Sequence, residues 1–338
     1  MRTGKELINA SKEFTGEDRG RSWAELFITI GLTIPAFGFL LVEGMPLFVR
    51  VIDAILVSLL YVRLFVIYHD YQHNAILQRS KTASVIMQAI GIYLLAPQTI
   101  WKRSHDYHHN NNSKLTISGI GSYPTVSVDR YLRLTSQEKA IYLINRHPLT
   151  IIFGYFTLFV YWLNLKSFFQ SPSKHTDSLA ALVIHVGAGS AIAYFFGATT
   201  FMLAWFIPFF VAFGMGSYLF YCQHNFPGAK FRENHDWKYD QAALESTSFM
   251  VMNPVMQWFT GNIGYHHVHH LNSRIPFYRL PEVMAKMPEL QGATTTCWNP
   301  VEIYRCFQLK LWDATNEKMI TLGELKKRQA YHQMQPQG

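Results

Sequence analysis

The sequence predicts an all-α integral membrane protein with about four transmembrane helices in two hairpins, further interfacial helices, and a histidine-rich cap on the cytoplasmic side. Of its 338 residues, 49% are hydrophobic and only 15% are charged, whereas about a quarter of the residues of a soluble domain are charged. Four apolar stretches approach or exceed the roughly 20 residues that a membrane-spanning helix needs. Histidines cluster in the polar segments that follow apolar ones. A soluble all-α protein with few surface charges is the alternative.

The first two apolar stretches, residues 24–42 and 46–68, are separated by only three residues. Such a short connection predicts a helical hairpin that returns the chain to the side where it began. Residues 1–22 are polar and carry several cations, among them Arg19 and Arg21. Cations beside a first span favour the cytoplasmic side, so we expect residues 1–22 to form a cytoplasmic N-terminal segment.

Two other apolar segments are expected not to cross the membrane. Residues 83–96 are too few for a full span and suit a re-entrant or interfacial segment. Residues 149–165 would, if they crossed, place two histidine clusters on opposite faces. Cations flank this segment on both sides, Arg146 before it and Lys166 and Lys174 after it. Both of its ends are therefore expected on the cytoplasmic side.

The second predicted hairpin consists of residues 178–196 and 199–222. The polar sequence that remains then gathers on the cytoplasmic side, and residues 281–338 are expected to form a cytoplasmic tail. No internal repeat or low-complexity linker divides the chain, so we expect one domain over residues 1–338. There is no nucleic-acid-binding motif, and the three cysteines lack the spacing of metal ligands. The net charge of +8 suits anionic lipid head groups or an acidic protein partner, and a positive-inside bias explains most of it equally well.

Three histidine clusters carry the chemistry. They read HDYQH, HDYHH and HHVHH, and their spaced histidines are His69 and His73, then His105, His108 and His109, then His266, His269 and His270. At this chain's histidine frequency, a random sequence would contain roughly 0.03 copies of HxxHH, and this chain has two. Helical residues three and four apart share a face, so each motif can aim its imidazoles at a common point.

These clusters predict a metal centre. Imidazole binds iron, zinc, copper and nickel, so the ligand type alone does not select the metal. Eight or more histidines exceed the needs of one ion, and two ions are therefore expected. The HExxH motif of zinc proteases is absent. The plainer interpretation, that these are ordinary interfacial or buried histidines, would suit a lone histidine better than three clusters.

With these motifs in this order, separated by apolar segments, residues 68–280 resemble the membrane fatty acid desaturase and hydroxylase superfamily. The third cluster, followed by the residues Ile275-Pro276-Phe277-Tyr278, is similar to acyl-lipid desaturases in particular. The resemblance implies two iron ions and a further histidine after the last span, which matches His224. The implied metal ligands are His69, His73, His105, His108, His109, His224, His266, His269 and His270.

The resemblance also bears on neighbouring residues. His267 occupies a variable position and is expected to be a bystander. Some relatives have an asparagine where this chain has Phe220, and Asn262 is a candidate substitute. Asp70 and Asp106 each follow a cluster's first histidine, so they could orient imidazoles. Alternatively, both are carboxylates that interact with a helix end.

The activity implied is desaturation: insertion of a double bond into a fatty acyl chain, with a lipid-linked chain expected, using O₂ and two electrons. No catalytic residue beyond the metal ligands is implied. The electrons would come from an external donor such as a ferredoxin or a small cytochrome, for which Lys326, Lys327 and Arg328 offer either a docking surface or a solvated helix face. Aromatic and methionine side chains could line an acyl tunnel or simply pack, namely Phe201, Met202, Trp205, Phe209, Phe213 and Met215.

Two other functions stay open at this point. A hydroxylase or ketolase acting on a lipid or carotenoid would use the same iron core and begin with the same hydrogen removal. A histidine-rich metal transporter is an alternative of another class, because polar residues within a membrane often mark ion pathways. Its histidines would be expected inside the spans, whereas these clusters follow apolar stretches. His185 does lie within a span, where helix packing among small neighbours is as good an explanation.

Overall fold

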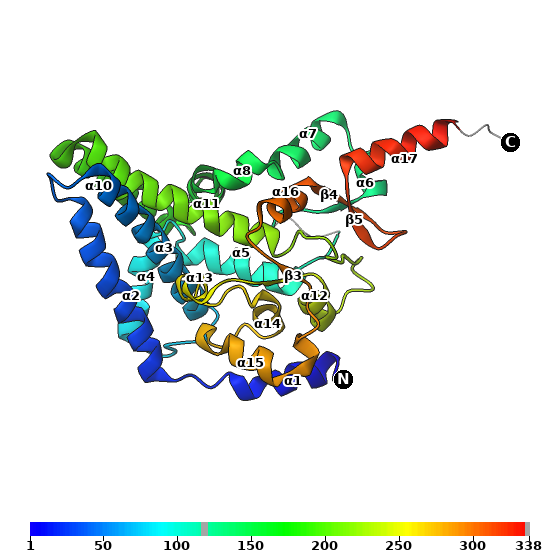
Figure 1. Cartoon of the computed structure of the whole chain (residues 1–338), viewed down its shortest axis with the longest axis horizontal. Coiled ribbons are helices and arrows are strands. Elements are labelled where there is room, and N and C mark those ends of the chain that lie inside the picture. Colours follow the sequence, from blue (N-terminus) through cyan, green and yellow to red (C-terminus); the bar gives the residue numbers. More distant parts are fainter. Residues whose placement is uncertain (116–120, 335–338) are drawn as a thin grey trace.

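The computed structural model describes residues 1–115 and 121–334 and is mostly helical (Figure 1). The longer helices are α2 (Arg19–Leu40), α3 (Leu47–Gln72), α4 (Lys81–Tyr93), α5 (Gln98–Asn111), the π-helix η2 (Tyr155–Lys166), α10 (Thr176–Phe201), α11 (Ile207–Cys222) and α17 (Leu322–Met334). The shorter helices are α1 (Gly4–Ser11), η1 (Lys12–Phe14), α6 (Val128–Arg133), α7 (Ser136–Asn145), α8 (Pro148–Ile152), α9 (Ser167–Gln170), η3 (Met202–Phe206), α12 (Tyr239–Glu245), α13 (Pro254–Phe259), α14 (His266–Leu271), η4 (Phe277–Arg279), α15 (Leu280–Lys286), η5 (Pro288–Leu290) and α16 (Pro300–Gln308).

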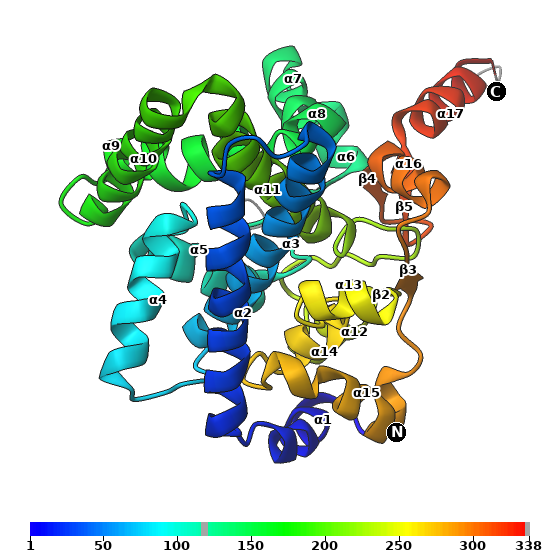
Figure 2. The ribbon, with the colours of Figure 1, turned by 60° about the vertical axis from the view of Figure 1, so that its left-hand side comes forward.

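The predicted first hairpin is present as α2 and α3, which pack against each other along their lengths (Figure 2). The Asp18 side chain caps α2 by accepting a hydrogen bond from the Arg21 amide. In its apolar window α3 is 61% buried within the protein, whereas α2 is only 17% buried. The central helix is therefore α3, and α2 turns a row of apolar side chains outward.

The predicted second hairpin is also present, although the helical segment runs from Thr176 to Cys222 over 47 residues. A straight helix of that length would measure about 70 Å, more than twice the hydrocarbon thickness of a bilayer. Gly197 interrupts it with φ +79°, a conformation that glycine adopts without strain. The His185 ring lies 4.9 Å from that of Trp205 and 4.6 Å from that of Phe209, so the chain folds back at Gly197.

Among the described residues, three helical segments are long and apolar enough to cross a membrane: α2, α3 and the segment from Thr176 to Cys222. Helices α4 and α5 together would make a fourth, but they meet at an angle of 88°, which suits a broken span or a re-entrant segment. The stretch predicted at residues 149–165 forms α8 and η2, neither of which is one of these candidate spans.

The structure is mostly helical, as expected, and the described part of the chain also contains two small sheets. One has the order β1 (Val126–Ser127), β4 (Leu309–Asp313), β5 (Lys318–Thr321), with β1 parallel to β4 and β4 antiparallel to β5. The other pairs β2 (Phe249–Met250) with β3 (Thr295–Thr296) in parallel. Three of these strands have only two residues, and their partners lie far away in the sequence. Local patterns could not reveal them.

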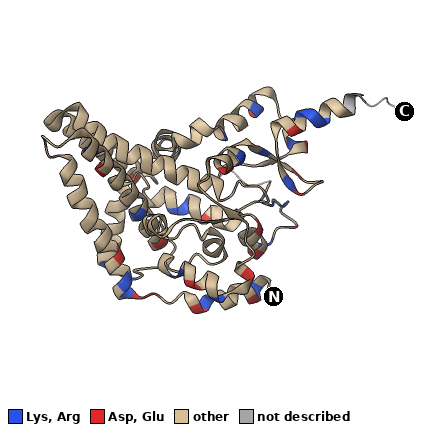
Figure 3. Ribbon diagram, viewed as in Figure 1, with Lys and Arg blue, Asp and Glu red and all other residues tan. Residues whose placement is uncertain are grey.

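The distribution of side chains is that of a membrane protein. Charged residues are sparse along α10 and α11. They gather outside these long apolar helices, near the chain termini and at the N-terminal end of α2 (Figure 3). Large apolar side chains on α2 and α10 are instead exposed, among them Ile34, Val183 and Phe195. An exposed apolar surface of this extent is stable in lipid and unstable in water.

Candidate metal centre

The nine histidines singled out from the sequence come together at one place. Their ring nitrogens form two groups, and within each group the candidate ligand atoms all lie within 4.8 Å of one another. The first histidine group contains His69, His73, His105, His109 and His269. The second histidine group contains His108, His224, His266 and His270. Elements far apart in the sequence supply them, namely the ends of α3 and α11 and the helices α5 and α14.

The expectation that each HxxHH motif aims at a common point was wrong. On α5, His105 and His109 are one turn apart and join the first group, whereas His108 points to the second. On α14, His269 joins the first group, whereas His266 and His270 join the second. Because consecutive helical residues project about 100° apart, adjacent histidines diverge. One helical turn can therefore serve two neighbouring centres.

The spacing within the groups fits metal ligation. In the first group, the Nε2 atom of His105 lies 2.9 Å from that of His69 and 3.1 Å from that of His109. In the second group, the Nε2 atom of His224 lies 2.9 Å from that of His266 and 3.1 Å from that of His108. Two imidazole nitrogens at adjacent positions of one ion, each about 2.1 Å from it, lie roughly 3 Å apart. The donor sets therefore fit one ion each.

Burial favours the neutral form of most of these imidazoles. It lowers the pKa of His105, His109 and His269 well below the ordinary value, and the neighbouring histidines lower it further. Burial likewise lowers the pKa of His224 to about 3. A metal ligand must be unprotonated, so the centre is prepared for ligation at neutral pH.

Asp70 contacts a histidine of the first group, which agrees with the interpretation that its carboxylate orients an imidazole. Its Oδ1 atom lies 3.2 Å from the Nδ1 atom of His69, and its Oδ2 atom accepts a hydrogen bond of 2.6 Å from the Phe277 amide. The carboxylate is buried. The Trp101 ring stacks on His105 with a centroid separation of 4.4 Å, which fixes that ring from the other side.

The other expected supporting residues lie elsewhere. Asp106 is half-exposed and forms an ion pair of 3.0 Å with Lys102, one turn earlier on α5, which matches neither of its two interpretations. The side-chain amide of Asn262 donates to the Phe277 carbonyl, so it holds the same segment that Asp70 holds. The Phe220 ring lies 4.8 Å from that of His108 and covers the second group. The buried His267 points to the Met284 sulfur, 3.2 Å away, and belongs to neither group.

A cavity of about 760 Å³ leads to the histidine groups, and three of their members, His69, His105 and His266, line it. Most of its wall is apolar and comes from α3, α5, η2 and α11. Of the six side chains considered for an acyl tunnel, Phe213 lines this cavity, while Trp205 and Phe209 pack around His185. The His185 Nε2 atom lies 2.6 Å from the Tyr155 hydroxyl, so its contacts are those of helix packing.

Sequence reasoning missed two residues that shape the site, Trp101 and Gln223. Trp101 is buried against His105 and lines the cavity. Gln223 lines the cavity beside His224 and donates to the Ile263 carbonyl, which ties the end of α11 to the turn before α14. The one sequence signal for these two residues is that each stands close to a histidine of the proposed site.

Two sets of side chains that can bind metal lie at the inner end of an apolar cavity. The helices around them have surfaces that suit lipid. These features define a histidine-rich protein that can hold metal next to an apolar substrate. Residues 46–298 match the family model described as fatty acid desaturase. The chain therefore belongs to the fatty acid desaturase family, and it is an oxidoreductase.

Three relatives illustrate the match. The chain is 27% identical to a fatty acid desaturase of Bacillus subtilis (strain 168), over 88% of this chain and 79% of the relative. It is 23% identical to an sn-1 oleoyl-lipid 12-desaturase of Anabaena variabilis, over 85% and 82%. It is 25% identical to an sn-1 acyl-lipid omega-3 desaturase (ferredoxin) of Synechocystis sp. (strain ATCC 27184 / PCC 6803 / Kazusa), over 87% and 80%.

Proposed function

We propose that this protein is a membrane-embedded di-iron desaturase that introduces a double bond into a lipid-linked fatty acyl chain. The observation that carries this proposal is the cavity, whose apolar wall ends at both histidine groups. An extended acyl chain in the cavity would present its methylene groups to the metal side. The names of the two cyanobacterial relatives support a lipid-linked substrate for this chain.

The proposed ligands are the five histidines of the first group and the four of the second, with one iron ion in each. Iron accepts imidazole nitrogen, and when bound it would supply the oxidising power drawn from O₂ that unactivated C–H bonds require. In the overall reaction, O₂, two protons, two electrons and two hydrogens of the acyl chain become two molecules of water. A carbon–carbon single bond becomes a double bond.

The chain's own residues bind the acyl chain and orient the metal ligands. The apolar wall excludes water from the acyl chain, and the turn that carries Phe277 fixes His69 through Asp70. Regiochemistry follows from the depth to which the acyl chain enters the cavity. We propose that the histidine groups face the cytoplasm and that the protein crosses the membrane several times, with residues 1–22 and 281–338 on the cytoplasmic side.

The two electrons are proposed to come from a small acidic carrier. The name of the Synechocystis relative includes ferredoxin, which supports a ferredoxin as the donor. Lys326 and Lys327 on α17 are exposed and could meet such a partner, whereas Arg328 is paired with Asp313 at 2.5 Å. The proposed docking surface on α17 therefore consists of Lys326 and Lys327 without Arg328.

The test is lipid profiling by mass spectrometry of a host that expresses the chain, compared with hosts that express His269→Ala or His235→Ala. His269 belongs to the first group, whereas His235 is exposed and pairs only with Asp236, so it serves as the matched control. We expect a new double bond with wild type and His235→Ala and its loss with His269→Ala. A hydroxylated or keto product would assign the chain to the hydroxylase branch. No product from iron-loaded protein with a donor would refute the proposal.

A further inference from the structure

Part of the cavity lining is polar, exposed and positively charged. Arg103 and Lys166 line the cavity there, together with Gln170, Ser171 and His175. Arg103 and Gln170 are exposed and Lys166 is partly exposed, whereas His175 and the three lining members of the histidine groups are buried. The cavity therefore runs from buried metal ligands to a cationic mouth at the protein surface.

The charges at this mouth have one sign. No aspartate or glutamate lines the cavity among the described residues. Neither Arg103 nor Lys166 forms an ion pair within residues 1–115 and 121–334. The Asp177 carboxylate, two residues from His175, accepts hydrogen bonds from the Thr99 amide and hydroxyl and from the Ser178 amide. The Asp106 carboxylate, on the same helix as Arg103, pairs with Lys102. Two cations are thus available to an anion that enters with the substrate.

The mouth also has the character of a membrane surface. The Lys166 ammonium lies 3.3 Å from the centroid of the Trp162 ring, and Trp162 is itself exposed and lines the cavity. Tryptophan and lysine pairs of this kind are typical of the interface between lipid and water, where lipid phosphates lie. Phe169 beside them is 74% exposed, as expected of a side chain in contact with lipid.

We propose that Arg103 and Lys166 bind the phosphate of a membrane phospholipid whose acyl chain occupies the cavity. Arginine and lysine are the side chains that recognise phosphate, the first through paired hydrogen bonds and the second as a point charge. This inference rests on the proposed function and narrows its substrate from any lipid-linked chain to an intact phospholipid. A glycolipid with the same acyl chains lacks the anion and would bind more weakly.

The test measures binding to the purified full-length protein by native mass spectrometry, with or without iron. The probes are phosphatidylglycerol, a galactosyl diacylglycerol with the same acyl chains, and the matching acyl-coenzyme A. We expect wild type to prefer phosphatidylglycerol over the galactolipid, and Arg103→Gln and Lys166→Gln each to weaken its binding about tenfold. Arg103→Lys and Lys166→Arg should restore most of it. Lys174→Gln is the matched control, because Lys174 is exposed near the mouth but does not line the cavity.

Equal binding of the two lipids by wild type, or unchanged phosphatidylglycerol binding by Arg103→Gln/Lys166→Gln, would overturn the inference. Preference for acyl-coenzyme A that depends on these cations would assign the phosphate to a soluble thioester and overturn the phospholipid assignment. The outcome is separable from that of the proposed function. If the cations govern lipid binding but no double bond forms in the host, the desaturase proposal fails alone. If a double bond forms without dependence on the cations, the head-group inference fails alone.

Discussion

Asp70 accepts a hydrogen bond of 2.6 Å from the Phe277 amide while its other carboxylate oxygen faces the His69 ring at 3.2 Å. One buried carboxylate thus joins the end of α3 to the turn that follows α14. The end of α3 carries His69, and α14, just before this turn, carries His269 of the same group. The position of His69 therefore depends on a contact between two residues 207 positions apart in the chain.

We predict that Asp70→Asn lowers iron content or activity by about tenfold or more, because the amide cannot hold both partners as the carboxylate does. Metal analysis of the purified protein and lipid profiling of the host measure the two effects. Asp106→Asn is the control, since Asp106 pairs with Lys102 at the surface. If both variants behave alike, Asp70 has no special role in orienting His69.

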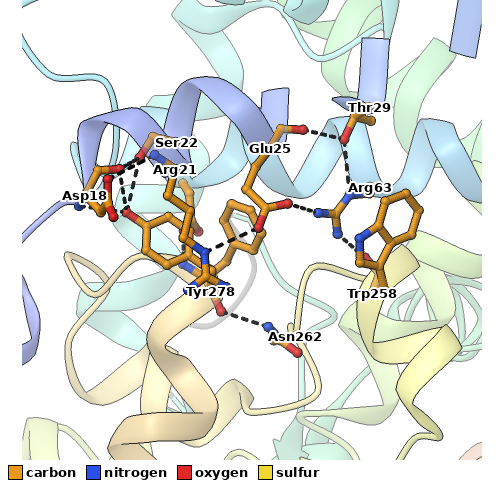
Figure 4. Close-up of polar contacts among 11 residues, drawn as sticks. Asp18, Arg21, Ser22, Glu25, Thr29, Arg63, Trp258, Asn262 and Tyr278 are labelled. Carbon is orange, nitrogen blue, oxygen red and sulfur yellow. Dashed lines mark hydrogen bonds and ion pairs between the residues drawn. The ribbon is translucent and has the colours of Figure 1, made fainter. Parts of the chain in front are cut away.

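The ion pair between Glu25 on α2 and Arg63 on α3 should be important for stability (Figure 4). Arg63 is buried, and it also donates to the Thr29 hydroxyl and the Trp258 carbonyl, with its guanidinium 3.9 Å from the Trp258 ring centroid. Removing one partner leaves a charge unpaired inside the protein, which costs about 3 kcal/mol or more.

Glu25→Ala is accordingly expected to lower the unfolding temperature in detergent by several degrees. Arg21→Ala removes the exposed partner of the same carboxylate and the contact of the Arg21 guanidinium with the Tyr278 ring, and should change the free energy of unfolding by less than about 1.5 kcal/mol. Comparable destabilisation of the two variants would mean that the buried pair contributes no more than the exposed one.

Gly216 offers a way to shorten the cavity without disturbing the helix. It lines the cavity, and a Cβ atom added there would meet no atom within 4 Å. We expect Gly216→Leu to fill part of the cavity and to reduce double-bond formation in long acyl chains more than in short ones. Lipid profiling resolved by chain length measures this. Gly187→Leu is the matched control, because Gly187 is equally open but faces outward from α10. Equal loss at all chain lengths would contradict an acyl-binding cavity.

The division of the histidines into two groups predicts different consequences for neighbouring residues on α14. His266→Ala removes a ligand from the second group and should reduce bound iron from about two ions per chain toward one. His267→Ala removes a buried histidine that contacts Met284, and iron binding should be retained. Iron per chain, measured by elemental analysis, distinguishes the two. Full iron binding by His266→Ala would contradict the proposed ligand set.

Much of the fold could be predicted because it depends on local patterns. Apolar stretches of sufficient length indicate the helices around residues 24–42 and 46–68, and a three-residue connection leaves them only an antiparallel arrangement. The hairpin at Gly197 followed from two apolar stretches in succession, and a single glycine with a non-helical backbone makes the turn. The short strands β1 to β3 could not be predicted, because two-residue strands acquire their partners only from the tertiary fold.

The sequence by itself determined that this chain is a histidine-cluster protein of lipid-compatible helices, since composition, apolar length and motif spacing are local properties. Motif spacing also singled out eight of the nine histidines that gather at the centre, and the family resemblance added His224. Only the tertiary structure decided how they divide, with His105 and His109 in one group and His108 in the other, because the division depends on which helix faces which. The same reason applies to Asp70, Asp106 and Arg103. Their roles depend on neighbours that folding brings close, and no local spacing records those neighbours.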